Sequence, residues 1–220
     1  ATLTATVANA AKQDIVLTTY VHGTATGGGT DYNLSANTLT IAQGATTASF
    51  TITGVGDGAN DDNETVIVRA IPYHNWNSGE PNNSGSTEHW VHIRSDQYWN
   101  DERNTRSFIY VMEVDQVINN IANYTYLGGH QGHSYFKSNS GSTWTNAKTA
   151  VESQIGYLAE ITSAAENSFI DGVIATNTWI GHYQDANYPQ YTEDSGGKPT
   201  AEGLGGWGTP SGLATTTDIT

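Results

Sequence analysis

The first part of the chain, up to residue 70, alternates hydrophobic and polar residues in short runs, with threonine at many of the polar positions. These runs are residues 2–7, 14–21, 38–41, 49–53 and 64–68. Three consecutive glycines at 27–29 interrupt the pattern, and no helical period occurs in this part. Alternating runs that recur about every eight to twelve residues between turn signals are typical of an antiparallel β-sandwich.

Beyond residue 70, aromatic residues and histidines become frequent and two short helices are expected. In the first, Trp144, Ala147, Val151 and Ile155 recur at helical spacing, and Gly156 can end the helix. We therefore predict a chain that is mainly β with a minor α+β part.

The second expected helix has a capping residue at Thr162 or Ser163, and Glu166 lies in its first turn. The apolar residues on one face of this helix are Phe169, Ile170 and Val173.

Acidic residues outnumber basic ones, with 22 Asp and Glu against 8 Lys and Arg and a formal net charge of -14. A field of this sign repels nucleic acid and anionic lipid, so neither is an expected partner. It suits calcium, which prefers oxygen ligands and offsets two negative charges for each ion bound.

The chain has no cysteine, which excludes disulfides, thiolate metal sites and a cysteine nucleophile. Secreted eukaryotic domains of this size usually carry disulfides, so we expect a bacterial surface protein in an extracellular location. No apolar run approaches the roughly 20 residues of a membrane helix, so membrane insertion is not expected. No signal peptide opens the chain, which starts inside an expected strand, and we expect it to be a fragment of a longer protein.

Residues 1–70 resemble the Calx-beta domain, a sandwich found in sodium/calcium exchangers and bacterial adhesins. The matching residues are 23–32, Thr40-Ile41-Ala42-Gln43-Gly44 and 52–66. The closing strand is missing after residue 70, and residues 208–220 look like that strand displaced to the far end. The family can bind calcium at one end of the sandwich, and a solvated acidic loop is the alternative. The acids in question are Asp57, Asp61, Asp62 and Glu64.

A set of carboxylate and amide side chains is expected on two neighbouring loops of residues 71–207. Its members are Glu80, Asn82, Glu88, Asn100 and Asp101. Calcium takes about six to eight oxygen ligands in flexible geometry, and such side chains supply them. A cis bond before Pro81 would turn the side chains on either side of it towards the same point.

These residues resemble the carbohydrate site of C-type lectins, which combines a Glu-Pro-Asn triplet (80–82), a later glutamate (Glu88) and a Trp-Asn-Asp triplet (99–101). The resemblance implies that all five side chains bind one Ca2+ and also a sugar through two neighbouring hydroxyls. The Glu-Pro-Asn form implies mannose, glucose, fucose or N-acetylglucosamine. The likeness extends over residues 71–207, although the cysteines of the family are absent. Its other matching segments are 108–113, 135–136, 144, 158–161, 165–169 and 179–181.

The two halves of the lectin pattern occur in swapped order, because the C-terminal half (71–115) precedes the N-terminal half (124–207). Circular permutation explains this order if the segment 115–123 joins the old ends. The lectin would then be inserted between the last two strands of the sandwich. Two alternatives stay open: tandem copies exchange halves, or segments that are not contiguous in the gene are joined.

The expected function is calcium-dependent sugar binding in a cell-surface adhesin, with glycans or glycoproteins on another surface and further repeats of the adhesin as partners. The alternatives are a peptide- or ice-binding lectin-like module or a purely structural repeat. No enzyme is expected, because carboxylates gathered around calcium are ionised whereas a general acid needs a raised pKa. A shared zinc site is not expected either. His89 and His92, like His130 and His133, have a spacing that points to opposite faces of a strand, so surface or partly packed histidines are expected.

Overall fold

The computed structural model describes residues 1–7, 10–56, 64–184, 207–208 and 217–219. The chain divides into two compact units, Ala1–Tyr73 with Thr216–Thr220, and His74–Thr215. Strands in several sheets and two short α-helices make it mainly β, so this prediction is confirmed. Within the described residues, every helix is too short or too polar to cross a membrane.

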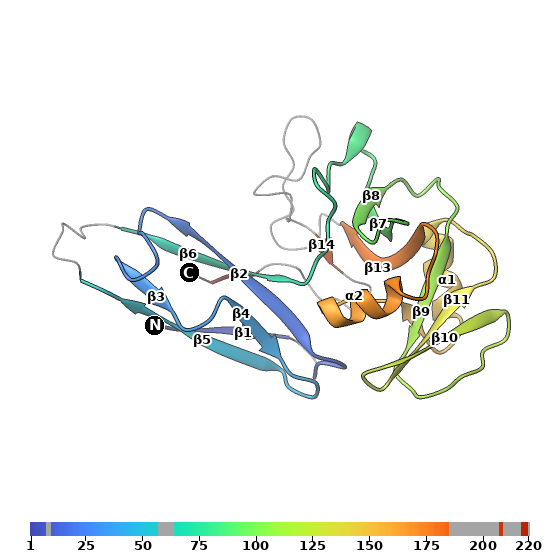
Figure 1. Cartoon of the computed structure of the whole chain (residues 1–220), viewed down its shortest axis with the longest axis horizontal. Coiled ribbons are helices and arrows are strands. Elements are labelled where there is room, and N and C mark those ends of the chain that lie inside the picture. The colour runs from blue at the N-terminus through green and yellow to red at the C-terminus, as the bar shows by residue number, and fades with distance from the viewer. Residues whose placement is uncertain (8–9, 57–63, 185–206, 209–216, 220) are drawn as a thin grey trace. The chain divides into compact units, whose positions relative to one another are not determined.

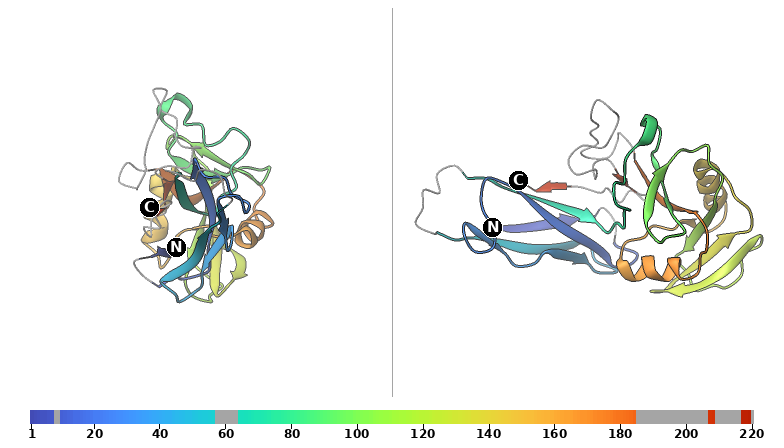
Figure 2. Two further views of the ribbon diagram at one scale, coloured as in Figure 1. Left: turned by 90° about the vertical axis from the view of Figure 1, so that its left-hand side faces the viewer. Right: turned by 45° about the horizontal axis from the view of Figure 1, so that its top comes forward.

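The first unit contains two antiparallel sheets, whose strands can be followed in Figures 1 and 2. One sheet has the order β1-β5-β3 and the other β15-β6-β2-β4. Alternate residues of both sheets are buried, for example Leu39 and Ile41 on one and Phe50 on the other. Burying one face of each sheet is what the alternating sequence requires. The strands are β1 (Thr2–Thr6), β2 (Ile15–Gly23), β3 (Tyr32–Leu34), β4 (Thr38–Ile41), β5 (Thr47–Gly54), β6 (Val66–Pro72) and β15 (Thr217–Ile219).

The last strand of the chain belongs to this unit. β15 pairs antiparallel with β6, with Thr217 opposite Ala70 and Ile219 opposite Val68. The strand that the sequence places between residues 208 and 220 therefore lies next to the strand that ends just after residue 70.

The second unit is built around one sheet with the order β10-β11-β9-β13-β7-β8. β9 pairs antiparallel with β11 and parallel with β13, so strands that come before and after residues 115–123 lie in one sheet. β12 also pairs with β9, and β14 pairs with β13. The strands are β7 (Trp90–Ile93), β8 (Trp99–Glu102), β9 (Ile109–Val114), β10 (Tyr124–His130), β11 (His133–Ser138), β12 (Tyr157–Leu158), β13 (Thr178–Gln184) and β14 (Trp207–Gly208).

Both expected helices occur, but each ends before the apolar pattern does. α1 (Trp144–Glu152) buries Trp144, Ala147 and Val151. The chain leaves the helix at Ser153, so Ile155 lies outside it with 59% of its surface exposed. The prediction that the helix includes Ile155 is therefore wrong. Helical spacing of a single residue does not show that the helix continues to it, because the ends of helices are poorly defined by sequence.

α2 (Ala164–Asp171) begins at Ser163, whose hydroxyl accepts the backbone N–H of Glu166. The carboxylate of Glu166 accepts the backbone N–H of Thr162, the residue before the cap, at 2.8 Å. The helix buries Ile170 and ends at Asp171, so Val173 follows it.

Aromatic and aliphatic side chains from β9, β11, β12, β13 and α1 form the core of the second unit. Two indole N–H groups in this core donate to backbone carbonyls, Trp144 to Ile180 at 2.7 Å and Trp179 to Ser142 at 2.9 Å. These bonds tie α1 and the turn before it to the centre of the sheet. The core residues are Tyr110, Met112, Val114, Phe136, Trp144, Ala147, Val151, Leu158 and Trp179.

Candidate calcium site

The segment between β6 and β7 carries the Glu80-Pro81-Asn82 triplet and a short 3-10 helix, η1 (Ser84–Ser86). The Glu80–Pro81 peptide bond is cis. The side-chain amide of Asn82 donates to Oε2 of Glu80, so the two side chains lie together on one side of the chain. A carboxylate and an amide from this segment thus face the same region.

Asp101 joins this segment to β8. Its carboxylate accepts two backbone N–H groups, from Asn82 at 3.1 Å and from Asn83 at 2.7 Å. The Asp101 side chain is fully buried, and Asn83 is buried as well. Two hydrogen bonds to a buried charged group fix the position of the segment over the strand.

Glu88 lies at the far end of the same segment. Its Oε2 accepts the backbone N–H of Ser84 at 3.0 Å, and its own N–H donates to the side-chain oxygen of Asn83 at 2.9 Å. Its Oε1 lies 3.6 Å from the guanidinium of Arg103, which follows β8. Glu88 is therefore held by η1 on one side and by a cation on the other.

Asn100 and Asp101 lie in the strand β8, so the prediction that these two residues lie on a loop is wrong. Successive residues of a strand point to opposite faces, and the burial of β8 alternates accordingly. The Asn100 amide contacts the backbone carbonyl of Asp101. Asp101 therefore faces the triplet as a buried side chain, whereas Asn100 lies half-buried on the other side of the strand.

Besides burial, the charge of Asp101 raises the pKa of both Glu80 and Glu88, whereas the hydrogen bond with Glu80 lowers the pKa of Asp101. Burial and the neighbouring Asp101 raise the pKa of Glu80 to about 7, and Glu88 adds to the effect. Burial also raises the pKa of Glu88, and the charge of Asp101 contributes. The pKa of Asp101 is raised by burial, although backbone hydrogen bonds from Asn83 and Asn82 act in the opposite direction. Such an arrangement holds more negative charge than its surroundings compensate, which a bound cation would relieve.

The oxygen donors of this set fit a hard cation, because all five side chains carry carboxylate or amide oxygens. The contacts bring Glu80, Asn82 and Asp101 together, place Glu88 within electrostatic reach, and leave Asn100 at the edge. We name these five residues the Glu80 site.

The acids after β5 can be assessed only in part. Asp57, Asp61 and Asp62 lie outside the described residues, and Glu64 is exposed just before β6. A second calcium site there stays a prediction.

The rings of His89 and His92 have different neighbours and do not form a common metal site in the described residues. His92 is buried against Phe108 and Trp179, with ring centroids 4.8 and 5.7 Å away, and burial lowers its pKa to about 4. His89 lies beside Gln184, with 3.1 Å between its Nδ1 and the amide oxygen.

His130 and His133 face each other, so the prediction that they point to opposite faces is wrong. β10 ends at His130 and β11 begins at His133, which makes them a cross-strand pair. The two residues between them, Gln131 and Gly132, both have positive φ, as a two-residue hairpin turn requires. The sequence His-Gln-Gly-His contains this turn signal. His133 is also buried, contrary to the expectation of a surface or partly packed histidine.

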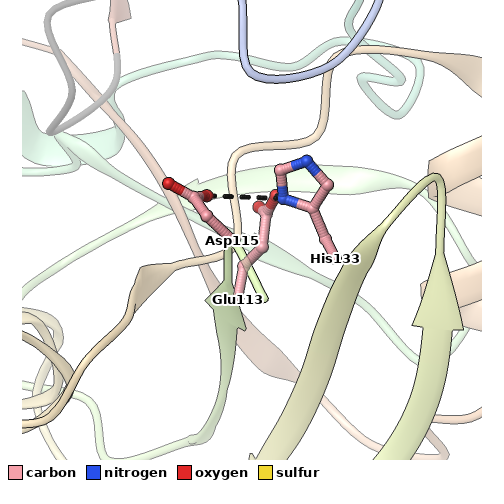
Figure 3. Close-up of side chains that lie close together, drawn as sticks. All are labelled: Glu113, Asp115 and His133. Atoms are coloured by element: carbon pink, nitrogen blue, oxygen red, sulfur yellow. Dashed lines mark ion pairs between the residues drawn. The ribbon is translucent and has the colours of Figure 1, made fainter. Parts of the chain in front are cut away.

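The hairpin creates a second polar cluster, which the sequence did not reveal. Figure 3 shows the side chains of Glu113, Asp115 and His133 close together. One ligand atom from each lies within 4.8 Å of the others. Among the described residues, this is the only set of three or more acidic, histidine or cysteine side chains that meets this distance. This group could hold a metal ion. The three carboxylates of the Glu80 site do not meet the same distance.

No family model matches the chain, and no solved structure shows a significant match to it. Interpretation of the sites therefore depends on the chemistry of the residues and on the motifs that they form.

Proposed function

We propose that the unit His74–Thr215 binds carbohydrate through calcium, in the manner of a C-type lectin, and that the chain is part of an extracellular adhesin. The observation that carries this proposal is the pair of hydrogen bonds from Asn82 and Asn83 to Asp101, together with the amide–carboxylate contact of Asn82 and Glu80. These bonds assemble oxygen donors from two separate segments at one place.

The ion would be held by the Glu80 site: Glu80, Asn82, Glu88 and Asp101 would bind it, and Asn100 would join them only by turning its side chain from the other side of β8. When bound, calcium offers open coordination positions to two neighbouring hydroxyls of a sugar. The chain's own groups add directional contacts, because carboxylates accept hydrogen bonds from hydroxyls and amides donate to sugar oxygens. The Glu-Pro-Asn order favours mannose, glucose, fucose or N-acetylglucosamine, by resemblance to the lectin family.

The first unit serves as a spacer in this proposal, in line with its resemblance to the Calx-beta domain. Partners are glycans or glycoproteins on another surface, and neighbouring repeats of the same adhesin. Because one such site binds a monosaccharide weakly, adhesion depends on many copies acting together.

Isothermal titration of the chelator-stripped chain with calcium, followed by a glycan array with and without calcium, tests the proposal. We expect one ion at the Glu80 site and binding of mannose-type glycans only when calcium is present. The variant Glu80→Gln should lose both, and the matched control Asp96→Asn, an exposed acid paired with Arg94, should keep both. A chain that binds calcium but no glycan would instead support a peptide-binding, ice-binding or structural module.

The sugar preference gives an independent check. Exchanging the two polar groups in the double variant Glu80→Gln, Asn82→Asp should shift binding from mannose towards galactose if the family rule applies. An unchanged mannose preference in this variant would count against the assignment of these two residues.

A further inference from the structure

The register of β9 and β11 brings Glu113, Asp115 and His133 to one face of the sheet. Val114 pairs with Ser134, so one step further along the antiparallel pair His133 lies opposite Asp115. Glu113 and Asp115 are two residues apart and share that face. The cluster is therefore a consequence of strand pairing, and it uses none of the residues of the Glu80 site.

The three ligand atoms lie at distances that suit a small metal ion. Nδ1 of His133 is 2.9 Å from Oε1 of Glu113 and 3.4 Å from Oδ1 of Asp115. A tetrahedral zinc ion with ligands at about 2.0–2.2 Å separates neighbouring ligand atoms by about 3.3–3.6 Å. Small adjustments of these side chains would therefore accommodate the ion.

Burial gives the cluster a closed side and an open side. Glu113 is fully buried and His133 is 3% exposed, whereas the side chain of Asp115 is 39% exposed. An ion can therefore enter past Asp115 and reach two ligands that are shielded from water.

Neighbouring groups orient the two carboxylates. The Tyr157 hydroxyl lies 2.9 Å from Oε1 of Glu113 and 2.6 Å from Oδ1 of Asp115. The backbone N–H of Glu160 donates to Oε2 of Glu113 at 3.0 Å. Such outer contacts fix ligand orientation in metal sites.

A second histidine adjoins the cluster independently. His130 is the cross-strand partner of His133, and its ring stacks on Phe169 with centroids 5.4 Å apart. Its Nε2 is buried and has no hydrogen-bond partner within the described part of the chain.

We propose that Glu113, Asp115 and His133 form a second metal site, which takes a divalent transition ion of the zinc type and is distinct from the calcium site. One imidazole nitrogen and two carboxylate oxygens are the ligand types of zinc, and a solvent molecule completes the sphere. Calcium is disfavoured here because it needs about six to eight oxygen ligands. The ion would join the end of β9 to the β10–β11 hairpin.

The test uses the whole chain, stripped of metal and then held in excess calcium so that the oxygen-only site is filled. Titration with Co2+, followed by its d–d absorption, and displacement by Zn2+ measure the second site. We expect one equivalent of Co2+ per chain, with zinc binding tighter, and a higher melting temperature in zinc.

Two variants remove ligands to different degrees. His133→Gln should abolish Co2+ binding, and Asp115→Asn, at a partly exposed position, should weaken zinc binding by at least about tenfold. Circular dichroism establishes that each variant is folded, and Asp115→Asn keeps the test decisive if His133→Gln unfolds. The controls Glu80→Gln and His89→Gln should bind zinc as the unchanged chain does.

Absence of Co2+ absorption and zinc uptake in the unchanged chain overturns the proposal and identifies His133 as an internal counter-ion of the two acids. Zinc binding that survives in both ligand variants also overturns it. Displacement of zinc by millimolar calcium would exclude the proposed ion class. None of these outcomes depends on sugar binding, so this proposal and the proposed function can fail separately.

Discussion

Asp101 accepts the backbone N–H of Asn83 at 2.7 Å, and both residues are buried. This bond, with its neighbour from Asn82, connects β8 to the segment that carries the Glu-Pro-Asn triplet. Both bonds are made between groups of the chain itself, and they use no metal ligand from outside it. Asp101 therefore has a structural role that can be measured apart from any metal.

The variant Asp101→Asn should be less stable than the unchanged chain even in excess chelator. Asparagine can accept from only one of the two N–H groups, so a buried donor loses its partner, at a cost of about 1–3 kcal/mol. Urea unfolding of the second unit, followed by tryptophan fluorescence, measures this difference. The control Asp96→Asn changes an exposed pair with Arg94 and should cost less than about 1 kcal/mol. Equal stabilities for the two variants would show that Asp101 does not have this structural role.

Calcium affinity should fall as the pH is lowered through neutrality. Burial, with the charge of Asp101, raises the pKa of Glu80 to about 7, so below that pH an ion must displace a proton. Each displaced proton lowers the apparent affinity up to about tenfold per pH unit. Calorimetric titrations at pH 8, 7 and 6 measure the slope. The same affinity at pH 8 and pH 6 would contradict the raised pKa of Glu80.

The mainly β class was predictable because alternating apolar positions and glycine-rich turns are local signals. Both helices were predictable for the same reason, as the cap at Ser163 and the apolar face of Trp144, Ala147 and Val151 show. The ends of the helices were not, because Ile155 continues the spacing after the backbone has left α1. The motifs that contain Asn82 and Asp101 were both visible in the sequence. That Asp101 lies in a strand was not.

The cluster of Glu113, Asp115 and His133 could not be predicted from spacing along the chain. It depends on the register of β9 against β11, and a shift by one residue would turn the side chains to the other face. The local signal that was available is Gln131-Gly132, a hairpin turn that places His130 opposite His133. That a circular permutation explains the swapped order of the lectin halves stays a prediction.

Acid should destabilise the second unit through His92. Burial lowers the pKa of His92 to about 4, below its ordinary value of 6.5, so the unfolded chain takes up the proton first. Its contribution to stability is therefore complete above pH 6.5 and is lost as the pH falls towards 4. The variant His92→Phe keeps the packing on Phe108 and Trp179 and should flatten the slope. Between pH 6.5 and 5.5, the free energy of unfolding of the unchanged chain should fall by about 1 kcal/mol more than that of His92→Phe.

Urea unfolding of both proteins in chelator at several pH values makes this comparison. The chelator removes calcium, whose binding would compete with protonation of Glu80. Protonation of Glu80 acts in the opposite sense to that of His92: the folded pKa of Glu80 is about 7, above the ordinary value of 4.5, so falling pH favours the folded state. That contribution is common to both proteins and cancels in the difference. Parallel slopes for the two proteins would show that His92 does not titrate differently on folding.

Gly181, the single glycine of β13, should be hard to replace, because its backbone closely approaches the segment that begins with β12. A Cβ atom at this position would lie 2.5 Å from the carbonyl oxygen of Leu158 and 3.1 Å from that of Ala159. The Gly181 N–H also donates to Ala159 at 2.7 Å, so the two segments cannot separate without losing a buried hydrogen bond. Gly181→Ala should therefore destabilise the unit by about 1–3 kcal/mol or more.

The matched control for this prediction is Gly172→Ala. Gly172 ends α2 with φ −62°, a conformation that any residue adopts, and the nearest atom to its added Cβ is the Ser168 carbonyl oxygen at 3.3 Å. We expect a change below about 1 kcal/mol there. Thermal unfolding of the two variants should give clearly separate midpoints, with Gly181→Ala the lower. Coincident midpoints would mean that β13 can move away from β12, and the close approach would then not be a fixed feature of the fold.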